Sequence, residues 1–199
     1  MNLWYSDLAM ERPFSLTVTG VTKMVSQIRG EEFTELQELM QAHSIMQSLM
    51  SITNIPQEEY EHNWQRVKGL LADAKLHALR IHGLVEKYDL AVTHALMTSK
   101  RKETLRLFEF IHGVLSKIGR EEIDFENKLE FISKKADEAR EKGGIARNTS
   151  PMVKRRAWMK VYEDYHRIYG TIQQELASLI KNIKQLLMLE GHIDRLLDS

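Results

Sequence analysis

The sequence contains no cysteine, only three prolines and no excess of charge of either sign. The absence of cysteine excludes a disulfide framework, a thiolate metal site and a thiol nucleophile. Three prolines and ten glycines are too few for the many turns of an all-β protein of 199 residues. The 28 basic residues balance the 28 acidic ones, which argues against a protein that coats a polyanion, although a local basic patch is compatible with this total.

Signals for export or membrane insertion are also lacking. The first residues do not combine a basic stretch, a continuous apolar core and a cleavage site of small residues. No eighteen apolar residues follow one another, because every long apolar segment carries a charge at each third or fourth position. We therefore expect a cytoplasmic protein.

Apolar residues recur instead at alternating steps of three and four, the period of an amphipathic helix. After Pro56 this pattern runs for five heptads without an error, which a β-strand could not produce. Two similar patterns follow from residue 105 and from residue 158; Glu122 interrupts the first of these, and Glu190 fills the vacant position of the second. The pattern after Pro56 comprises Tyr60, Trp64, Val67, Leu71, Ala74, Ala78, Ile81, Val85, Tyr88, Val92 and Ala95.

The polar stretch Met97–Glu103 separates the first two long patterns, but it contains neither glycine nor proline. It could be a turn between antiparallel helices, or part of one helix of about 85 residues. We favour the turn, because an uncapped helix of that length would need a partner along its whole length. Gly143 and Gly144 then predict the end of the second long helix, and residues 145–151 have the composition of a loop.

Two shorter helices are expected upstream, separated at residue 30. Residues 14–19 also alternate as in a strand, but a lone strand would leave its backbone groups without partners. The whole pattern predicts an all-α protein: an elongated up-and-down helical bundle with long coiled-coil-like helices in one domain, residues 17–199, after an N-terminal arm of residues 1–16. The expected helices span about residues 17–29, 31–53, 57–97, 100–142 and 152–198.

The helix after Pro56 carries a second apolar line on the side opposite its seam, where a helix at the rim of a bundle should be polar. The simpler explanation, which we favour for this helix, is that residues 17–53 cover the line. The other explanation is an interface with another chain, in which two glycines let a second helix approach closely. The candidate interface residues are Gly69, Ala72, Leu76, Leu79, Gly83 and Leu90.

The N-terminal arm supplies three more candidate interface residues, Trp4, Tyr5 and Leu8. Aromatic side chains with few rotatable bonds can anchor a segment in a groove of a partner. The arm could equally fold back onto its own bundle, which is the interpretation we favour.

Basic residues cluster near residue 100 and again at Lys154, Arg155 and Arg156, beside Trp158. Cations next to an aromatic ring can contact phosphates and stack on a base. However, Trp158 lies on the predicted apolar seam and acidic residues follow at positions 163 and 164, so a solvated helix start explains this cluster better.

Motifs for catalysis or metal binding are weak. The sequence has no glycine-rich phosphate loop, no nucleophile elbow and no His-Glu-x-x-His motif. A carboxylate-bridged metal pair would need inward-pointing Glu-x-x-His motifs on two helices, and only His112 adjoins an apolar seam. We therefore expect no catalytic residue, no cofactor and no metal site. The Glu-x-x-His pairs are Glu59 with His62, Glu109 with His112, and Glu163 with His166.

These patterns favour a non-enzymatic module for protein–protein interaction, such as a scaffold, an adaptor or a chaperone-like subunit of an assembly. The expected partner is another protein chain, as a homo-oligomer, a helical partner or both. A helical-bundle metal protein or enzyme is the alternative. Binding of nucleic acid or of an anionic membrane through the basic clusters is the second alternative.

Overall fold

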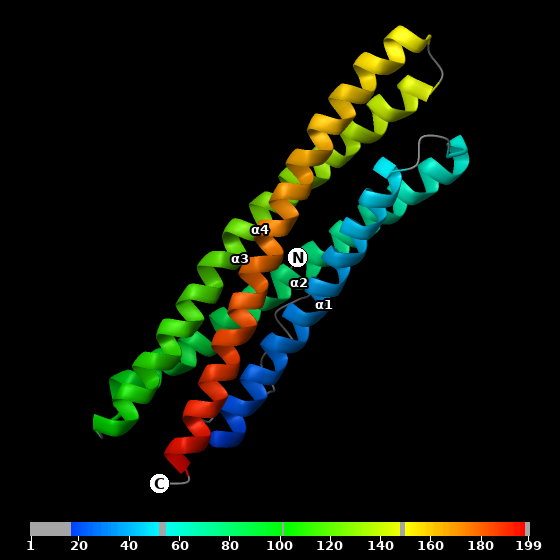
Figure 1. Ribbon diagram of the computed structural model, residues 1–199. Coiled ribbons are helices and arrows are strands. Elements are labelled where there is room, and N and C mark those ends of the chain that lie inside the picture. The colour runs from blue at the N-terminus through cyan, green and yellow to red at the C-terminus, as the bar shows by residue number, and fades with distance from the viewer. Residues whose placement is uncertain (1–16, 52–54, 101, 148–149, 198–199) are drawn as a thin grey trace, which may run out of the picture.

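A computed structural model describes residues 17–51, 55–100, 102–147 and 150–197. These residues form four helices, α1 (Val18–Ser51), α2 (Gln57–Thr98), α3 (Lys102–Arg147) and α4 (Pro151–Leu197), and the four stretches contain no strand. The helices run up, down, up and down beside one another (Figure 1). The predicted all-α up-and-down bundle is confirmed.

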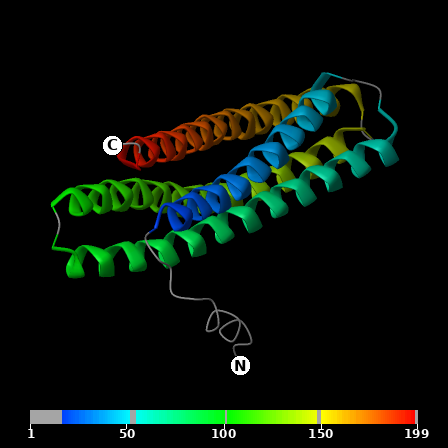
Figure 2. The ribbon, with the colours of Figure 1, turned by 90° about the horizontal axis from the view of Figure 1, so that it is seen from below.

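Each helix packs on two neighbours, because α1 and α3 both contact α2 and α4. The contact between α1 and α4 closes the bundle (Figure 2). Helices α2, α3 and α4 contain 42, 46 and 47 residues, so at about 1.5 Å per residue each is about 63 to 70 Å long. Within the described stretches, no helix has an apolar segment that could cross a bilayer.

The predicted break at residue 30 is wrong, because α1 is one continuous helix of 34 residues. The apolar pattern stops where acidic residues replace apolar ones, yet Glu32 and Glu35 are buried on the same seam as Ile28 and Leu39. Gly30 lies on the exposed side of α1, where a glycine weakens a helix by about 1 kcal/mol without ending it. The two short helices expected over residues 17–53 are therefore a single element.

A turn separates α2 from α3 at Ser99, as predicted. The backbone of Ser99 is extended (φ −77°, ψ 136°), and its N–H donates a hydrogen bond to the carbonyl of Ala95. Because the extended residue takes the chain out of the helix, residues 57–142 belong to two helices rather than one.

The predicted end of α3 at Gly143 is wrong, because the helix continues to Arg147. Gly143 is buried against Tyr60 of α2. A Cβ atom built on Gly143 would lie 1.8 Å from the Tyr60 hydroxyl oxygen and 2.8 Å from its Cζ atom. The glycine therefore makes room for a ring of the neighbouring helix and does not stop its own.

In the C-terminal half of α4 the predicted seam residues Leu179, Leu186 and Ile193 are buried, but at the levels between them the buried residue comes one position earlier than predicted. The apolar pattern favours Leu176 and Ile183, whereas Glu175 and Asn182 are the residues buried most deeply at these two levels. Leu176 and Ile183 are partly buried beside them, and Glu190 is partly exposed. At these two levels α4 thus buries a polar side chain, although the next residue in the sequence is apolar.

The hydrophobic core consists of two clusters, one in each half of the bundle. On α1 they are separated between Ile28 and Leu39, and on α3 between Ile118 and Phe125. Buried polar side chains occupy this level, and we call them the polar layer. The polar layer consists of Glu32, Glu35, Glu122, Glu175 and Asn182.

Candidate functional site

The second apolar line of α2 faces outward along its whole length. Leu76, Leu79 and Leu90 are 46%, 44% and 73% exposed. Helix α1 packs beside this face, where Glu31 of α1 lies 2.5 Å from the Nδ1 atom of His77. The expectation that residues 17–53 cover the line is therefore wrong for the described part of that segment. We call the outward-facing residues the α2 stripe: Gly69, Ala72, Leu76, Leu79, Gly83 and Leu90.

Ion pairs border the α2 stripe on both sides. Toward α3, the Nζ atom of Lys68 lies 3.2 Å from the carboxylate of Asp137. Toward α1, the guanidinium of Arg80 lies 3.7 Å from the carboxylate of Glu31. These contacts hold charged groups at the edges, while leucine, alanine and glycine occupy the centre of the face except at Glu86, between Gly83 and Leu90. An apolar centre with a polar rim is the usual composition of a protein interface.

Gly69 and Gly83 lie two heptads apart on the stripe, and a Cβ atom built on either one meets no atom within 4 Å. The bundle gains no packing from the missing side chains, although glycine weakens a helix by about 1 kcal/mol relative to alanine. Gly113 and Gly170 are equally open, so openness alone does not mark an interface. Gly83 lies one turn after the exposed Leu79 and Gly69 one turn before the exposed Ala72, so a second helix could approach the stripe closely at both glycines.

The polar layer crosses the middle of the bundle and takes carboxyl groups from three helices. Glu32 and Glu35 of α1 are fully buried. Glu122 of α3 and Glu175 of α4 are almost fully buried. Within the described residues, the carboxyl oxygens of Glu32 and Glu35 accept no hydrogen bond of normal geometry. The Asn182 amide lies beside Glu32 and is likewise buried without such a bond. Buried polar groups without partners are rare in folded proteins and therefore indicate a special role.

Few positive charges face these carboxyls. The Nζ atom of Lys128 lies 2.7 Å from Glu175, and Lys181 lies 3.6 Å from Glu121, which precedes Glu122 in α3. In the part of the chain that the structure describes, Glu32 and Glu35 form no ion pair. The α1 side of the polar layer is therefore acidic without a counterion.

Burial raises the pKa values of the layer. Burial first, and then repulsion from Glu122, raise the pKa of Glu32 to about 9 and that of Glu35 to about 10. Burial, and then repulsion from Glu175, raise the pKa of Glu122 to about 8. Burial also raises the pKa of Glu175, while the nearby Lys128 acts in the opposite direction. Glu32, Glu35 and Glu122 are therefore mainly protonated in the folded protein at pH 7.

Because these carboxyls must take up protons when the chain folds at neutral pH, the folded protein is less stable at pH 7 than at acidic pH. The ordinary pKa of a glutamate is 4.5, about 2.5 below pH 7. At about 1.4 kcal/mol per pH unit, a carboxyl that folds in the protonated form lowers the free energy of unfolding at pH 7 by a few kcal/mol. The polar layer therefore lowers the stability of the fold at neutral pH, which calls for a functional explanation.

The Glu-x-x-His pairs do not point into the bundle. His62 and His166 are exposed. His112, which adjoins an apolar seam, is half-exposed at the edge between α2 and α3, and its Nδ1 atom lies 2.6 Å from Asp89. Across the described helices, no three acidic or histidine side chains come close enough together to hold a metal ion. The carboxyls of the polar layer therefore do not converge on one centre.

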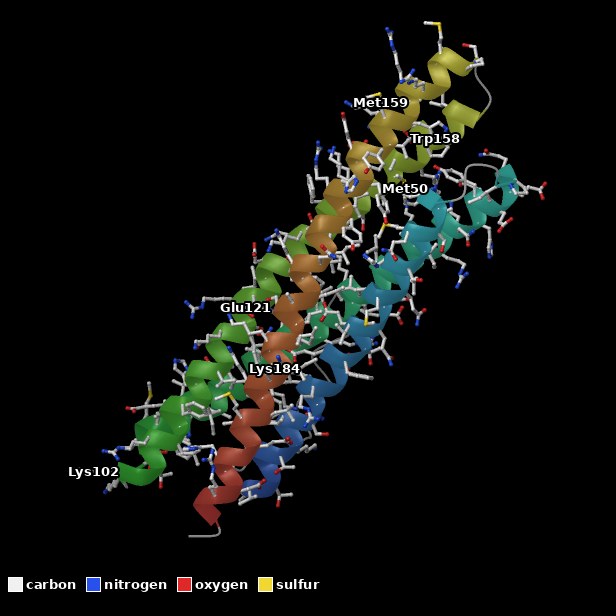
Figure 3. All side chains as sticks on the ribbon, viewed as in Figure 1. Met50, Lys102, Glu121, Trp158, Met159 and Lys184 are labelled. Carbon is white, nitrogen blue, oxygen red and sulfur yellow. The ribbon has the colours of Figure 1, made fainter. Side chains whose placement is uncertain are left out.

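The two basic clusters lie at opposite ends of the bundle. Lys102 begins α3 and Trp158 lies near the start of α4, and Figure 3 shows the two residues far apart. Arg155 and Arg156 are exposed, whereas the side chain of Lys154 lies outside the described part of the structure. Because of this separation, the clusters cannot combine into one phosphate-binding surface.

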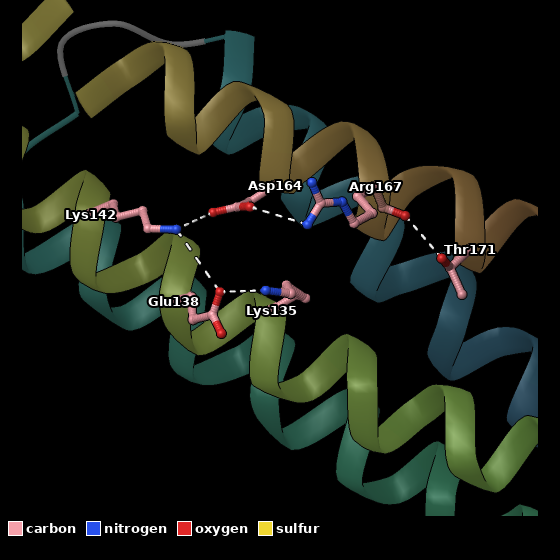
Figure 4. A network of polar contacts seen from close by, with 6 residues as sticks. All are labelled: Lys135, Glu138, Lys142, Asp164, Arg167 and Thr171. Atoms are coloured by element: carbon pink, nitrogen blue, oxygen red, sulfur yellow. Dashed lines mark hydrogen bonds and ion pairs between the residues drawn. The ribbon is translucent and has the colours of Figure 1, made fainter. Parts of the chain in front are cut away.

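Polar contacts near the start of α4 tie it to α3 (Figure 4). The Nζ atom of Lys142 lies 2.5 Å from the buried Asp164 and 3.9 Å from Glu138. Glu138 also accepts a hydrogen bond of 2.7 Å from Lys135, and Arg167 lies 3.9 Å from Asp164. From the sequence, Asp164 was expected to weaken the basic cluster on the surface. It is instead buried, and its ion pair with Lys142 joins α4 to α3.

The polar layer could not be predicted from a helical pattern that is traced through apolar residues only. The steps of three and four that join Val25 and Ile28 lead on to Glu32, Glu35 and then Leu39, so the signal was a seam that continues through charged residues. The other candidate interface residues, Trp4, Tyr5 and Leu8, lie outside the described residues.

Comparisons of the chain with protein-family models, with curated proteins and with solved structures find no match. The α2 stripe and the polar layer are therefore the features of this chain that point to a function.

Proposed function

We propose that this protein is a non-enzymatic interaction module that pairs with a second copy of itself through the α2 stripe, and so serves as a scaffold or adaptor subunit. The observation that carries this proposal is the exposure of Leu76, Leu79 and Leu90 on a helix whose other face is buried. Apolar surface that leaves water contributes about 25 cal/mol per Å². Covering the stripe with another helix would therefore favour association.

The stripe suits a second copy because its small and large residues complement each other. Consider two α2 helices that run antiparallel about a two-fold axis near residue 81. Leu79 of each copy would then lie opposite Gly83 of the other, and Ala72 opposite Leu90. A two-fold axis repeats each contact, so small side chains would meet large ones four times along the seam.

The charges beside the stripe support the same arrangement. Asp73 would lie near Lys87 of the second copy, and Lys75 near Asp89 of the second copy. Each attraction occurs twice. Arg80 would meet the Arg80 of the second copy near the axis, a single repulsion that the attractions outnumber. Charge complementarity of this kind sets the orientation of paired helices.

The length of the stripe predicts a reversible dimer. Gly69 and Leu90 lie about 32 Å apart along the helix axis at 1.5 Å per residue. A single seam of this length is smaller than a standard protein interface. We therefore expect a dissociation constant on the order of micromolar rather than nanomolar.

Single cysteines test the orientation, because the chain has no cysteine of its own. In the antiparallel pair, His82→Cys places two thiols near the axis, and a short bis-maleimide reagent should link them into a dimer. Leu90→Cys places its two thiols about 27 Å apart, so this variant should remain unlinked. A parallel pair in register would reverse the two results and would overturn the antiparallel arrangement.

Charged substitutions test whether the stripe is the interface at all. Leu76→Glu combined with Leu79→Glu should abolish the concentration-dependent increase in mass, measured by light scattering, while the helical circular dichroism is retained. Leu187→Glu on α4 is the matched control, because Leu187 is 46% exposed, like Leu76, and it should leave the dimer intact. A wild-type chain that stays monomeric up to millimolar concentration would refute the proposal.

A further inference from the structure

Self-association does not explain the polar layer, because its side chains are buried inside the bundle. We propose that the polar layer is a proton-controlled joint, which holds the two halves of the core together when its carboxyls are protonated and separates α1 from α4 when they ionise.

Hydrogen-bond chemistry supports this role. An ionised carboxylate offers only acceptors, whereas a protonated carboxyl also donates through its O–H group. Among the described residues no cation pairs with Glu32 or Glu35, while the neighbouring Asn182 amide contributes both donors and an acceptor. Each proton that binds to a carboxyl of the polar layer therefore converts an acceptor oxygen into a hydrogen-bond donor, and donors are scarce among these side chains.

The position of the layer makes the seam between α1 and α4 the place that opens. Apolar packing is interrupted at this level, and α1 packs less extensively on α4 than on α2. A groove of about 410 Å³ lies between α1 and α4, lined in part by Gly30, Phe33 and Ile183. Beside it, Arg29 pairs with Glu190 at 2.8 Å, and both side chains are partly exposed. Phe33 and Ile183 in the groove are next to Glu32 and Asn182 in the sequence, so opening this seam would bring water to the layer.

The charges around the layer favour proton uptake. His77 and Arg80 contact Glu31, and Lys181 contacts Glu121, so these cations belong to the periphery. Of the carboxyls in the layer, Glu175 has the close cation, Lys128. The charged or titratable groups that surround the layer are Glu31 on α1, His77 and Arg80 on α2, Glu121, Asp124 and Lys128 on α3, and Lys181 on α4.

The sign of the pH effect follows from the raised pKa values. Folding takes up protons wherever the pKa of a carboxyl in the folded state exceeds its value of 4.5 in the unfolded state. The contribution of the layer to stability is therefore complete below about pH 4.5 and is lost as the pH rises. Of Glu32, Glu35 and Glu122, Glu122 ionises first within the folded protein, because its pKa of about 8 is lower than the other two.

Urea unfolding at pH 5.5, 6.5 and 7.5 and constant ionic strength tests the joint in the full chain. Each carboxyl that is protonated only in the folded state lowers the folding equilibrium constant by about tenfold per pH unit. One to three such carboxyls predict a fall of about tenfold to about thousandfold per unit. Hydrogen exchange, corrected for its intrinsic pH dependence, should show residues 28–39 and 182–189 losing protection as the pH rises, before the rest of the bundle does.

Glutamine variants assign the effect to the layer. Glu32→Gln, Glu35→Gln and Glu122→Gln together keep the shape of the side chains without their titration, and should flatten the pH dependence. Glu130→Gln is the control, because the Glu130 side chain is 78% exposed, and it should leave the slope unchanged. Should the triple variant fail to fold, Glu122→Gln alone should reduce the slope by about tenfold per pH unit.

Three results would overturn the proposal. One is equal stability of the wild type at pH 5.5 and 7.5, and another is a glutamine variant that folds and keeps the full slope. The third is a stabilisation at pH 7.5 by magnesium or calcium chloride beyond that of sodium chloride at equal ionic strength. This last result would make the layer a cation site rather than a proton site.

Discussion

Replacing Gly143 with alanine should destabilise the bundle, although alanine favours a helix more than glycine does. The new methyl group would lie 1.8 Å from the hydroxyl oxygen of Tyr60 and 2.8 Å from its Cζ atom, well inside van der Waals contact. Tyr60 is buried, and its ring centroid lies 6.2 Å from that of Trp64 in an edge-to-face contact. Because the core is closely packed, the tyrosine ring cannot move aside without disturbing its neighbours.

Two opposing contributions set the size of the effect. Glycine to alanine stabilises a helix interior by about 1 kcal/mol, whereas overpacking a filled core costs about 1 to 3 kcal/mol. The shortest contact lies so far inside van der Waals range that we expect the upper end of that cost, and hence a net loss of about 2 kcal/mol. For a chain of this size the melting temperature should fall by about 4 to 8 °C.

Gly113 provides the matched control in the same helix, because a Cβ atom built there meets nothing within 4 Å. Gly113→Ala should therefore raise the free energy of unfolding by about 1 kcal/mol. Adding Tyr60→Phe to Gly143→Ala removes the nearest atom and should recover part of the loss. Urea denaturation followed by circular dichroism measures all these proteins. If Gly143→Ala stabilised the fold as much as Gly113→Ala, the close approach of Tyr60 would be disproved.

Other substitutions test the remaining features. Lys142→Met should lower the free energy of unfolding by about 2 to 3 kcal/mol, because it removes the closest cation from the buried Asp164; Lys68→Met, which breaks an exposed pair with Asp137, should cost less than about 1 kcal/mol in the same urea assay. Glu35→Gln should raise stability by about 4 kcal/mol at pH 7.5 and have little effect at pH 4.5, since the Glu35 pKa is raised to about 10 by burial; an equal gain at both pH values would contradict its titration.

The periodicity of the long helices is local information, and it was sufficient for most of the fold. From Tyr60 to Val92, every member of the pattern after Pro56 is buried in α2. The turn between α2 and α3 could also be predicted, because a polar stretch interrupts two strong patterns there. Apolar side chains at helical spacing bury themselves almost regardless of their partners, which is why these predictions needed no tertiary model.

Glycine and glutamate were misread because their roles depend on distant residues. Gly143 resembles a helix stop, but Tyr60 of another helix explains it. Glu32 and Glu35 resemble the solvated start of a new helix, but their burial depends on α3 and α4, which begin only at Lys102 and Pro151. A charge in a sequence is assigned to the surface by default, so a buried acidic layer escapes any reading based on polarity.

The α2 stripe lies between these two cases. Its residues could be named from the sequence, because a second apolar line on one helix is again a matter of spacing. Whether α1 covers that line could not be predicted, since the pattern of α1 fits either side of α2 equally well. Spacing along the chain thus determined which residues form helices and which faces are apolar. Only the packing of the four helices decided that Leu76 and Leu79 remain in water while Glu32 and Glu35 leave it, because burial depends on neighbours that local spacing does not specify.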